Sequence, residues 1–136
     1  MRAIEKPEGF KQIMLTLARE PAHPIGDRRI GYELIAPLDD RGHINAAQWR
    51  SHRTLCRVTK FRRNEPQEIG HLIRRQGGAW AFHYDIIGQD EDEGGYHFGD
   101  HAFVPGEYVT ITERGVQHTY QVLNVCDLPM KGVVAS

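Results

Sequence analysis

Histidine is the residue type with reactive chemistry that is unusually frequent in this sequence, with eight among 136 residues. Imidazole is the commonest protein ligand for transition metals, and it titrates close to neutral pH. The histidines stand at the following positions: His23, His43, His52, His71, His83, His97, His101 and His118. They are densest between residues 83 and 101, so that stretch is the first place to look for a site.

A candidate metal site can be built within this stretch. On a strand, His83 and Asp85 point to the same face, because side chains alternate with a period of two. If the following loop folds back over that face, His97 and His101 join them. Three nitrogen or oxygen ligands around an open position are typical of a catalytic zinc or non-haem iron centre. The simpler interpretation is that these are scattered loop and surface residues. Apart from a possible transition metal, the sequence does not indicate any cofactor.

Charge is unevenly distributed, although the net charge is only -1. Residues 50–75 hold eight basic side chains against two acidic ones, whereas residues 85–107 hold seven acidic and no basic ones. A basic strand beside exposed aromatic residues can bind single-stranded nucleic acid. The side chains that would do so are Arg57, Lys60, Arg62, Arg63 and Arg75, with Trp80, Phe82 and Tyr84 as a stacking platform. The competing interpretation places these aromatic residues in the core and the basic ones on a solvated face, and the balanced total argues against a general polyanion binder.

Several reaction classes lack their sequence signatures. There is no Gly-x-Ser-x-Gly nucleophile elbow, no phosphate-binding glycine loop with its lysine, and no dinucleotide fingerprint. The two cysteines, Cys56 and Cys126, are far apart and belong to no Cys-x-x-Cys pair. We interpret both as small buried apolar side chains.

Strands are predicted along most of the chain from the period-two alternation of apolar residues. Short turn signals separate them, among them Gln76–Gly78, Pro105–Gly106 and Arg114–Gly115. Residues 89–95 are predicted to form an acidic loop. The expected strands cover residues 11–20, 29–38, 55–62, 68–75, 79–87, 107–113 and 116–125.

One short helix is predicted over residues 46–52. Asn45 can cap it through its side-chain oxygen, and Gln48 stands three residues later, as in a capping box. Trp49 would anchor this helix to the rest of the protein.

These elements predict a mainly β fold, namely a small single-domain barrel or a strongly curled antiparallel sheet of about seven strands with one short helix. Residues 1–10 are expected to be a loosely ordered lead-in, and residues 11–136 to form the β domain. The N-terminus lacks the apolar core of a signal peptide, and no apolar run approaches the ~20 residues that cross a bilayer. We therefore expect a soluble, cytoplasmic protein without a membrane partner.

The sequence favours a non-catalytic binding or interaction module over an enzyme, because the fold can be predicted and no complete catalytic set can. Its partner would be a protein or a small-molecule ligand that the sequence does not identify. The sequence also leaves undecided whether the protein forms a homodimer. The alternatives are a metal-binding protein or metal-dependent enzyme and, third, a single-stranded nucleic-acid binder.

Overall fold

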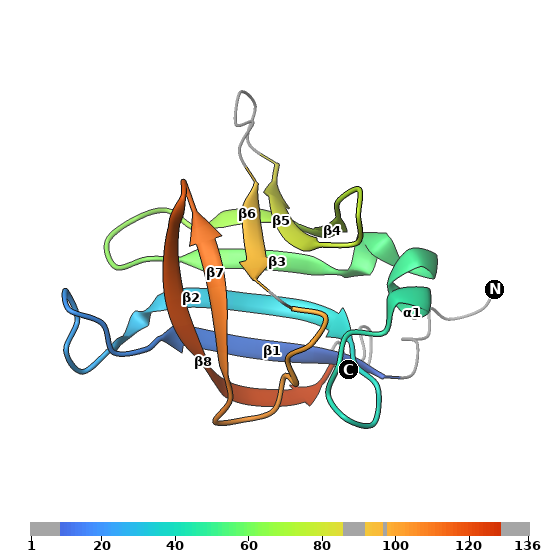
Figure 1. Cartoon of the computed structure of the whole chain (residues 1–136), viewed down its shortest axis with the longest axis horizontal. Helices are drawn as coiled ribbons and strands as arrows, with labels where there is room; N and C mark the ends of the chain where they lie inside the picture. The colour runs from blue at the N-terminus through green and yellow to red at the C-terminus, as the bar shows by residue number, and fades with distance from the viewer. Residues whose placement is uncertain (1–8, 86–91, 97, 129–136) are drawn as a thin grey trace, which may run out of the picture.

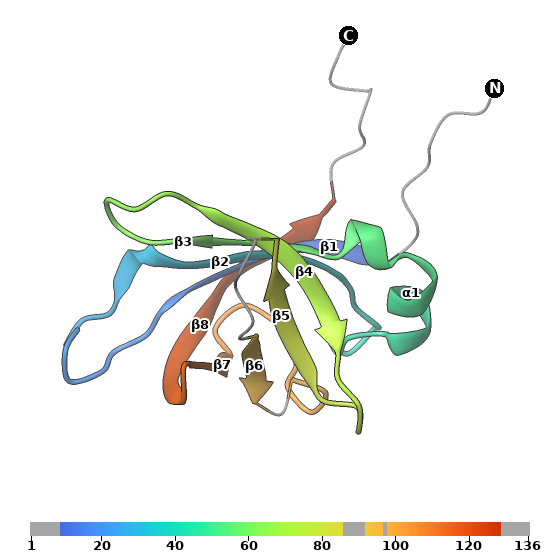
Figure 2. The ribbon, with the colours of Figure 1, turned by 90° about the horizontal axis from the view of Figure 1, so that it is seen from above.

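The computed structural model describes residues 9–85, 92–96 and 98–128. Eight strands and one short α-helix make up the described part of the chain, with a single 3₁₀ turn, η1 (Arg53–Leu55), after the helix. Figures 1 and 2 show the strands as a ring with the helix at one end. The elements are β1 (Phe10–Leu17), β2 (Asp27–Pro37), α1 (Ala46–Ser51), β3 (Arg57–Phe61), β4 (Glu68–Arg74), β5 (Trp80–Tyr84), β6 (Glu93–Tyr96), β7 (Tyr108–Glu113) and β8 (Val116–Asp127).

The strands form a closed antiparallel barrel in which each strand pairs with the next along the chain. β8 closes the ring by pairing with β1, where Leu15 lies opposite Val122. In the described residues every strand therefore has a paired neighbour on both sides, as barrel closure requires. The prediction of a mainly β barrel with one short helix is thus confirmed, with eight strands instead of about seven.

The additional strand is β6, and the prediction of a loop through residue 95 is wrong for its last residues. Glu93 lies opposite Phe82 of β5, and Gly95 lies opposite Ile111 of β7. Gly94 and Gly95 give this segment a low intrinsic preference for a strand. Pairing on both sides decides its conformation. The first part of the predicted loop, residues 89–91, lies outside the described residues.

The predicted helix is confirmed, and it closes one end of the barrel. Asn45 adopts an extended backbone and its side chain accepts a hydrogen bond from the Gln48 amide at 3.1 Å. Trp49 is buried, packs edge to face on Trp80 and donates its indole hydrogen to the Leu72 carbonyl oxygen at 2.8 Å. The helix is therefore fixed by its cap and by one aromatic anchor.

The core fills the barrel with the inward-facing side chain of alternate residues. Trp80, Phe82 and Tyr84 are all buried, which confirms the interpretation of this aromatic face as core. Phe98 and Phe103, from the segment before β7, extend the aromatic packing, with Phe98 edge to face on Phe82 and on Phe103. An eight-stranded barrel has an interior just wide enough for side chains to fill, and this one is filled.

The two cysteines differ in exposure. Cys56 is buried, and burial raises the pKa of its thiol to about 12. Cys126 is exposed, so its predicted burial is wrong. The reason is a bulge in β8, where the pairing with β1 shifts between Val122 and Asn124. A bulge inserts one residue and reverses the alternation beyond it.

Candidate functional site

A group of polar side chains fills the barrel interior at the end opposite α1. Several of its residues belong to the strand ends next to the β3–β4 and β7–β8 connections, which Figure 1 draws toward the left. Lys60 is the inward residue at the end of β3, Glu93 begins β6, and Glu113 ends β7. We call the following set the mouth cluster: Tyr32, Lys60, Arg62, Tyr84, Glu93, Glu113 and Tyr120.

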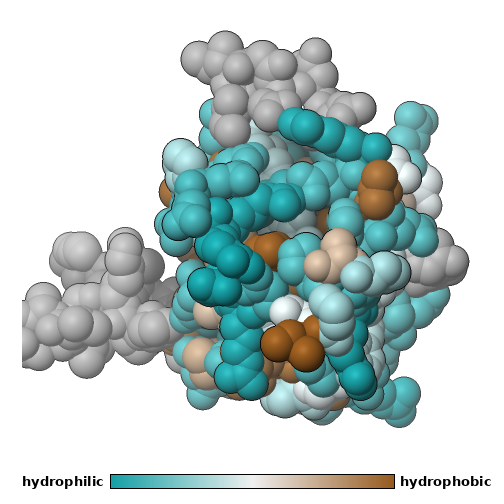
Figure 3. All heavy atoms as spheres, turned by 90° about the vertical axis from the view of Figure 1, so that its left-hand side faces the viewer, coloured by the Kyte–Doolittle hydropathy of each residue, from teal (hydrophilic) through white to brown (hydrophobic). Residues whose placement is uncertain are grey.

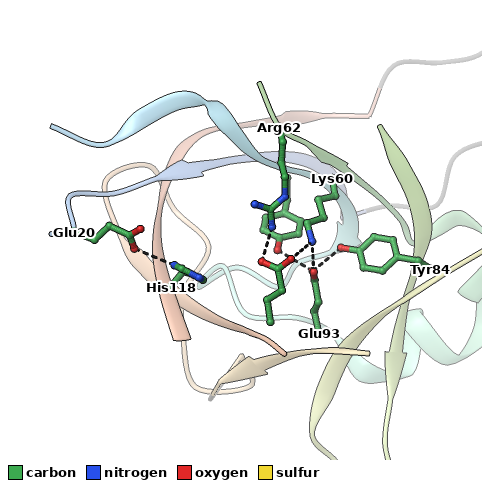
Figure 4. A network of polar contacts seen from close by, with 8 residues as sticks. Glu20, Lys60, Arg62, Tyr84, Glu93 and His118 are labelled. Atoms are coloured by element: carbon green, nitrogen blue, oxygen red, sulfur yellow. Dashed lines mark hydrogen bonds and ion pairs between the residues drawn. The ribbon is translucent and has the colours of Figure 1, made fainter. Parts of the chain in front are cut away.

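Glu93 is the central acceptor of the mouth cluster. Its Oε1 accepts hydrogen bonds from the hydroxyls of Tyr32 at 2.8 Å and Tyr84 at 2.7 Å, and its Oε2 forms an ion pair with the Lys60 ammonium. Figure 4 shows Lys60, Tyr84 and Glu93 converging from three different strands. The side chains of Lys60 and Glu93 are only 5% and 8% exposed. Charges this deeply buried are tolerated only when they are paired.

Glu113 extends the mouth cluster toward solvent. Its Oε2 accepts from Lys60 at 2.7 Å, and its Oε1 accepts from the Arg62 guanidinium at 2.5 Å. The cluster thus contains two basic and two acidic groups in alternation, and its net charge is zero. Figure 3 shows that this end of the molecule is largely hydrophilic.

The tyrosine hydroxyls of the mouth cluster are held in their protonated, donating form. Burial, then the neighbouring phenol and carboxylate, raise the pKa of Tyr32. Burial, then the charge and hydrogen bond of Glu93, raise that of Tyr84. Burial raises the pKa of Tyr120 to about 12. No fully buried side-chain nitrogen or oxygen of the described residues lacks a hydrogen-bond partner. The mouth cluster is therefore a polar network whose fully buried hydrogen-bonding groups are all paired.

Glu113 should make the stability of the barrel depend on pH. Burial raises its pKa, but Lys60 and Arg62 outweigh burial, so the pKa lies below the ordinary 4.5. A lowered pKa in the folded state stabilises the protein above pH 4.5 and loses that contribution as the pH falls through the lowered value. We expect the difference in unfolding free energy between wild type and Glu113→Gln to be largest near pH 7 and to shrink as the pH falls through the lowered pKa of Glu113. Urea unfolding at several pH values measures it, and a constant difference would contradict the assignment.

The second candidate site is a groove of about 850 Å³ on the outside of the barrel along β6. It lies between the β4–β5 turn and the β7–β8 turn, which flank β6 in Figure 2. Six glycines line it, and no side chain projects from Gly94 or Gly95 at its centre. Its residues are Arg75, Gly77, Gly78, Ala79, Trp80, Asp92, Gly94, Gly95, Phe98, Gly99, Asp100, Thr112, Arg114 and Gly115. We call it the β6 groove.

Three positions give the β6 groove its polar character. Arg75, directly after β4, has its Nε 4.0 Å from Asp92 Oδ2. Arg114, in the β7–β8 turn, forms no ion pair with any residue that the structure describes. Its φ of 51° is a left-handed conformation that is uncommon for a residue with a side chain.

The described residues of the predicted metal site lie on the outer surface or in a loop. His83 is exposed on β5, with Nδ1 2.7 Å from Asp92 Oδ1. Asp85 follows that strand and approaches His71 at 3.4 Å. His101 is half-buried before β7, and His97 lies outside the described residues. In the described ranges no three His, Cys, Asp or Glu side chains are placed to hold one metal ion.

The basic residues considered for nucleic-acid binding are dispersed. Lys60 points into the barrel and is buried, because it has the same parity on β3 as Val58. Arg57 lies beside His71, at 3.4 Å. The other three are paired with carboxylates: Arg62 with Glu113, Arg63 with Asp27 and Arg75 with Asp92.

Comparison with known proteins adds no relative. No protein-family model, curated protein or solved structure matches this chain. Within the part of the chain that the structure describes, no helix is long and apolar enough to cross a membrane. The assignment of function therefore depends on the two sites described above.

Sequence reasoning missed both sites, although one of them left a signal. Lys60 and Glu113 continue the buried parity of Val58 and Ile111 on their strands. A charged residue at an inward position signals a buried ion pair. The β6 groove has no comparable signal in the sequence. It forms because β5 and β7 pair on either side of the two glycines of β6, and the sequence does not show this pairing.

Proposed function

We propose that this protein is a non-catalytic binding module that captures a small ligand in the β6 groove. The volume of the groove supports this proposal, since ligand sites typically measure about 300–1,000 Å³. The interior of the barrel is occupied by aromatic side chains and by the mouth cluster, so a ligand would bind outside. The proposal is that the barrel acts as a rigid frame and that its outer wall carries the binding surface.

The glycines of β6 are the feature that carries the proposal. A glycine within a strand weakens it, and it often marks a place where a ligand approaches the backbone closely. A Cβ at Gly94 would lie 3.5 Å from Arg75 Nη1 and 4.0 Å from Thr112 Cβ, which are ordinary contacts. Packing alone does not require a glycine at this position. An open groove floor is a physical reason for having one.

A non-catalytic role is supported by the chemistry of the groove. It is lined by arginine, aspartate, threonine and tryptophan side chains, and no serine, cysteine or histidine of the described residues lines it. The buried Cys56 has its thiol pKa raised to about 12, which makes it a poor nucleophile. We therefore expect binding without turnover.

The variant Gly94→Val tests the proposal, because it fills the groove floor with a residue that fits a strand. Ligand-observed NMR with a library of small polar and aromatic fragments should give hits on the wild type whose affinity falls about tenfold or more in Gly94→Val. The control is Thr59→Val on β3, an outward position two strands away from the groove wall formed by β5 and β6. Fragment binding that is equal in Gly94→Val, or an absence of hits, would refute the proposal.

A further inference from the structure

The indole hydrogen of Trp80 is a donor without a hydrogen-bond partner in the described part of the chain. Trp80 is only 4% exposed, yet its Nε1 has no hydrogen-bond partner among the described residues. Buried tryptophans usually pair this hydrogen, as Trp49 does with the Leu72 carbonyl oxygen at 2.8 Å. No fully buried side-chain nitrogen in the described part of the chain lacks a partner, so Trp80 Nε1 must retain contact with solvent.

The geometry around Trp80 places that contact in the β6 groove, which the residue lines. Gly99 lies alongside, and a Cβ on it would stand 3.9 Å from Trp80 Nε1. The missing side chain leaves the indole hydrogen accessible. Arg74 covers the ring face at 4.9 Å from its centroid and is held by the Gly78 carbonyl oxygen at 3.0 Å. The donor is thus fixed in place before any ligand arrives.

Arginine side chains add positive charge to the same groove. Arg114 has no ion-pair partner among the described residues, and Arg75 Nε lies 4.0 Å from Asp92 Oδ2, which is beyond hydrogen-bond distance. Two carboxylates also line the groove and oppose an anion. Asp92 is engaged by His83 at 2.7 Å, and Asp100 has a partner within the chain. The two arginines and two aspartates balance in formal charge, but both aspartates have partners, whereas the Trp80 indole N–H and the Arg114 guanidinium have none among the described residues.

We propose that the ligand of the β6 groove is an oxyanion, a phosphoryl or carboxylate group that accepts hydrogen bonds from Trp80 Nε1 and from the guanidinium groups of Arg114 and Arg75. This inference rests on the proposed function, because it names the ligand class of the same groove. Guanidinium pairs well with both groups, since its planar fork matches two oxygens. An indole N–H that already faces the groove adds a neutral donor without any rearrangement.

The experiment uses the two indole N–H signals of the full chain in ¹⁵N–¹H spectra, assigned to Trp49 and Trp80. Inorganic phosphate and citrate are titrated separately against sodium chloride at matched ionic strength. We expect the Trp80 indole signal to shift saturably with at least one of these anions, while the Trp49 signal stays fixed by its bond to Leu72. The response to phosphate or to citrate tells which oxyanion the groove prefers.

The variants Arg114→Gln and Arg75→Gln should each weaken the binding about tenfold or more, as the loss of one charged hydrogen bond predicts. Arg28→Gln removes the same charge from an exposed arginine outside the groove and should leave the affinity unchanged. Equal weakening in Arg28→Gln, or no saturable Trp80 shift, would overturn the inference. If neutral fragments bind the groove and neither anion does, the ligand class is wrong and the binding function stands. If neither fragments nor anions bind the groove, the proposed binding function and the oxyanion inference are both wrong.

Discussion

Replacement of Glu93 by alanine is expected to lower the free energy of unfolding by about 3–5 kcal/mol, the usual cost of breaking a buried ion pair. The carboxylate is 8% exposed and pairs with Lys60, which is 5% exposed. Alanine leaves the ammonium with Glu113 alone and deprives the hydroxyls of Tyr32 and Tyr84 of their acceptor. Urea unfolding followed by tryptophan fluorescence measures the loss.

Two further variants separate the lost pair from the lost volume. Glu65→Ala removes an exposed glutamate and should change stability by no more than about 0.5 kcal/mol. The double variant Lys60→Met with Glu93→Gln removes both charges and keeps an amide oxygen for the tyrosines. It should recover to within about 2 kcal/mol of the wild type, because a buried ion pair contributes little beyond what its isosteres supply. If Glu93→Ala lowered the free energy of unfolding by less than about 1 kcal/mol, the network as described would be contradicted.

The mouth cluster bears on how much of this protein is predictable from sequence. Alternation identified the strands, because most inward residues, such as Val58 and Ile111, are apolar and buried. The same alternation extends to Lys60 and Glu113, which are inward and charged. Comparing parity with charge along each strand would have predicted a buried ion pair. Counting basic residues in a linear window assigned Lys60 to the surface instead.

The β6 groove and its strand could not be predicted in this way. The sequence Glu93-Gly-Gly-Tyr96 follows an acidic stretch and has the composition of a loop. It becomes a strand because β5 and β7 supply partners on both sides. β6 lies between β5 and β7 only because the whole barrel closes, which cannot be read from the residues of β6 alone. Intrinsic preference at glycines is too weak to oppose it.

The largest local sensitivity of the barrel wall to substitution is expected at two glycines, Gly31 on β2 and Gly70 on β4. A Cβ at Gly31 would overlap the Leu15 carbonyl oxygen, and one at Gly70 would overlap that of His83. Both obstacles are backbone atoms of a paired strand, so neither can move aside without separating the strands. We expect Gly31→Ala and Gly70→Ala each to cost about 3 kcal/mol or more, at or above the usual range for overpacking.

Two adjacent glycines of β6, Gly94 and Gly95, allow the expected loss of stability to be compared within the same protein. Gly95→Ala places its Cβ 2.5 Å from the ring of Phe98, a buried side chain that can shift, and should cost about 1–3 kcal/mol. Gly94→Ala meets only ordinary contacts, so it should be neutral or stabilise by about 0.4–1 kcal/mol through the unfolded state. Urea denaturation of the four variants should thus rank Gly31 and Gly70 above Gly95, and Gly95 above Gly94. Any other order would mean that the strands approach one another differently around the ring.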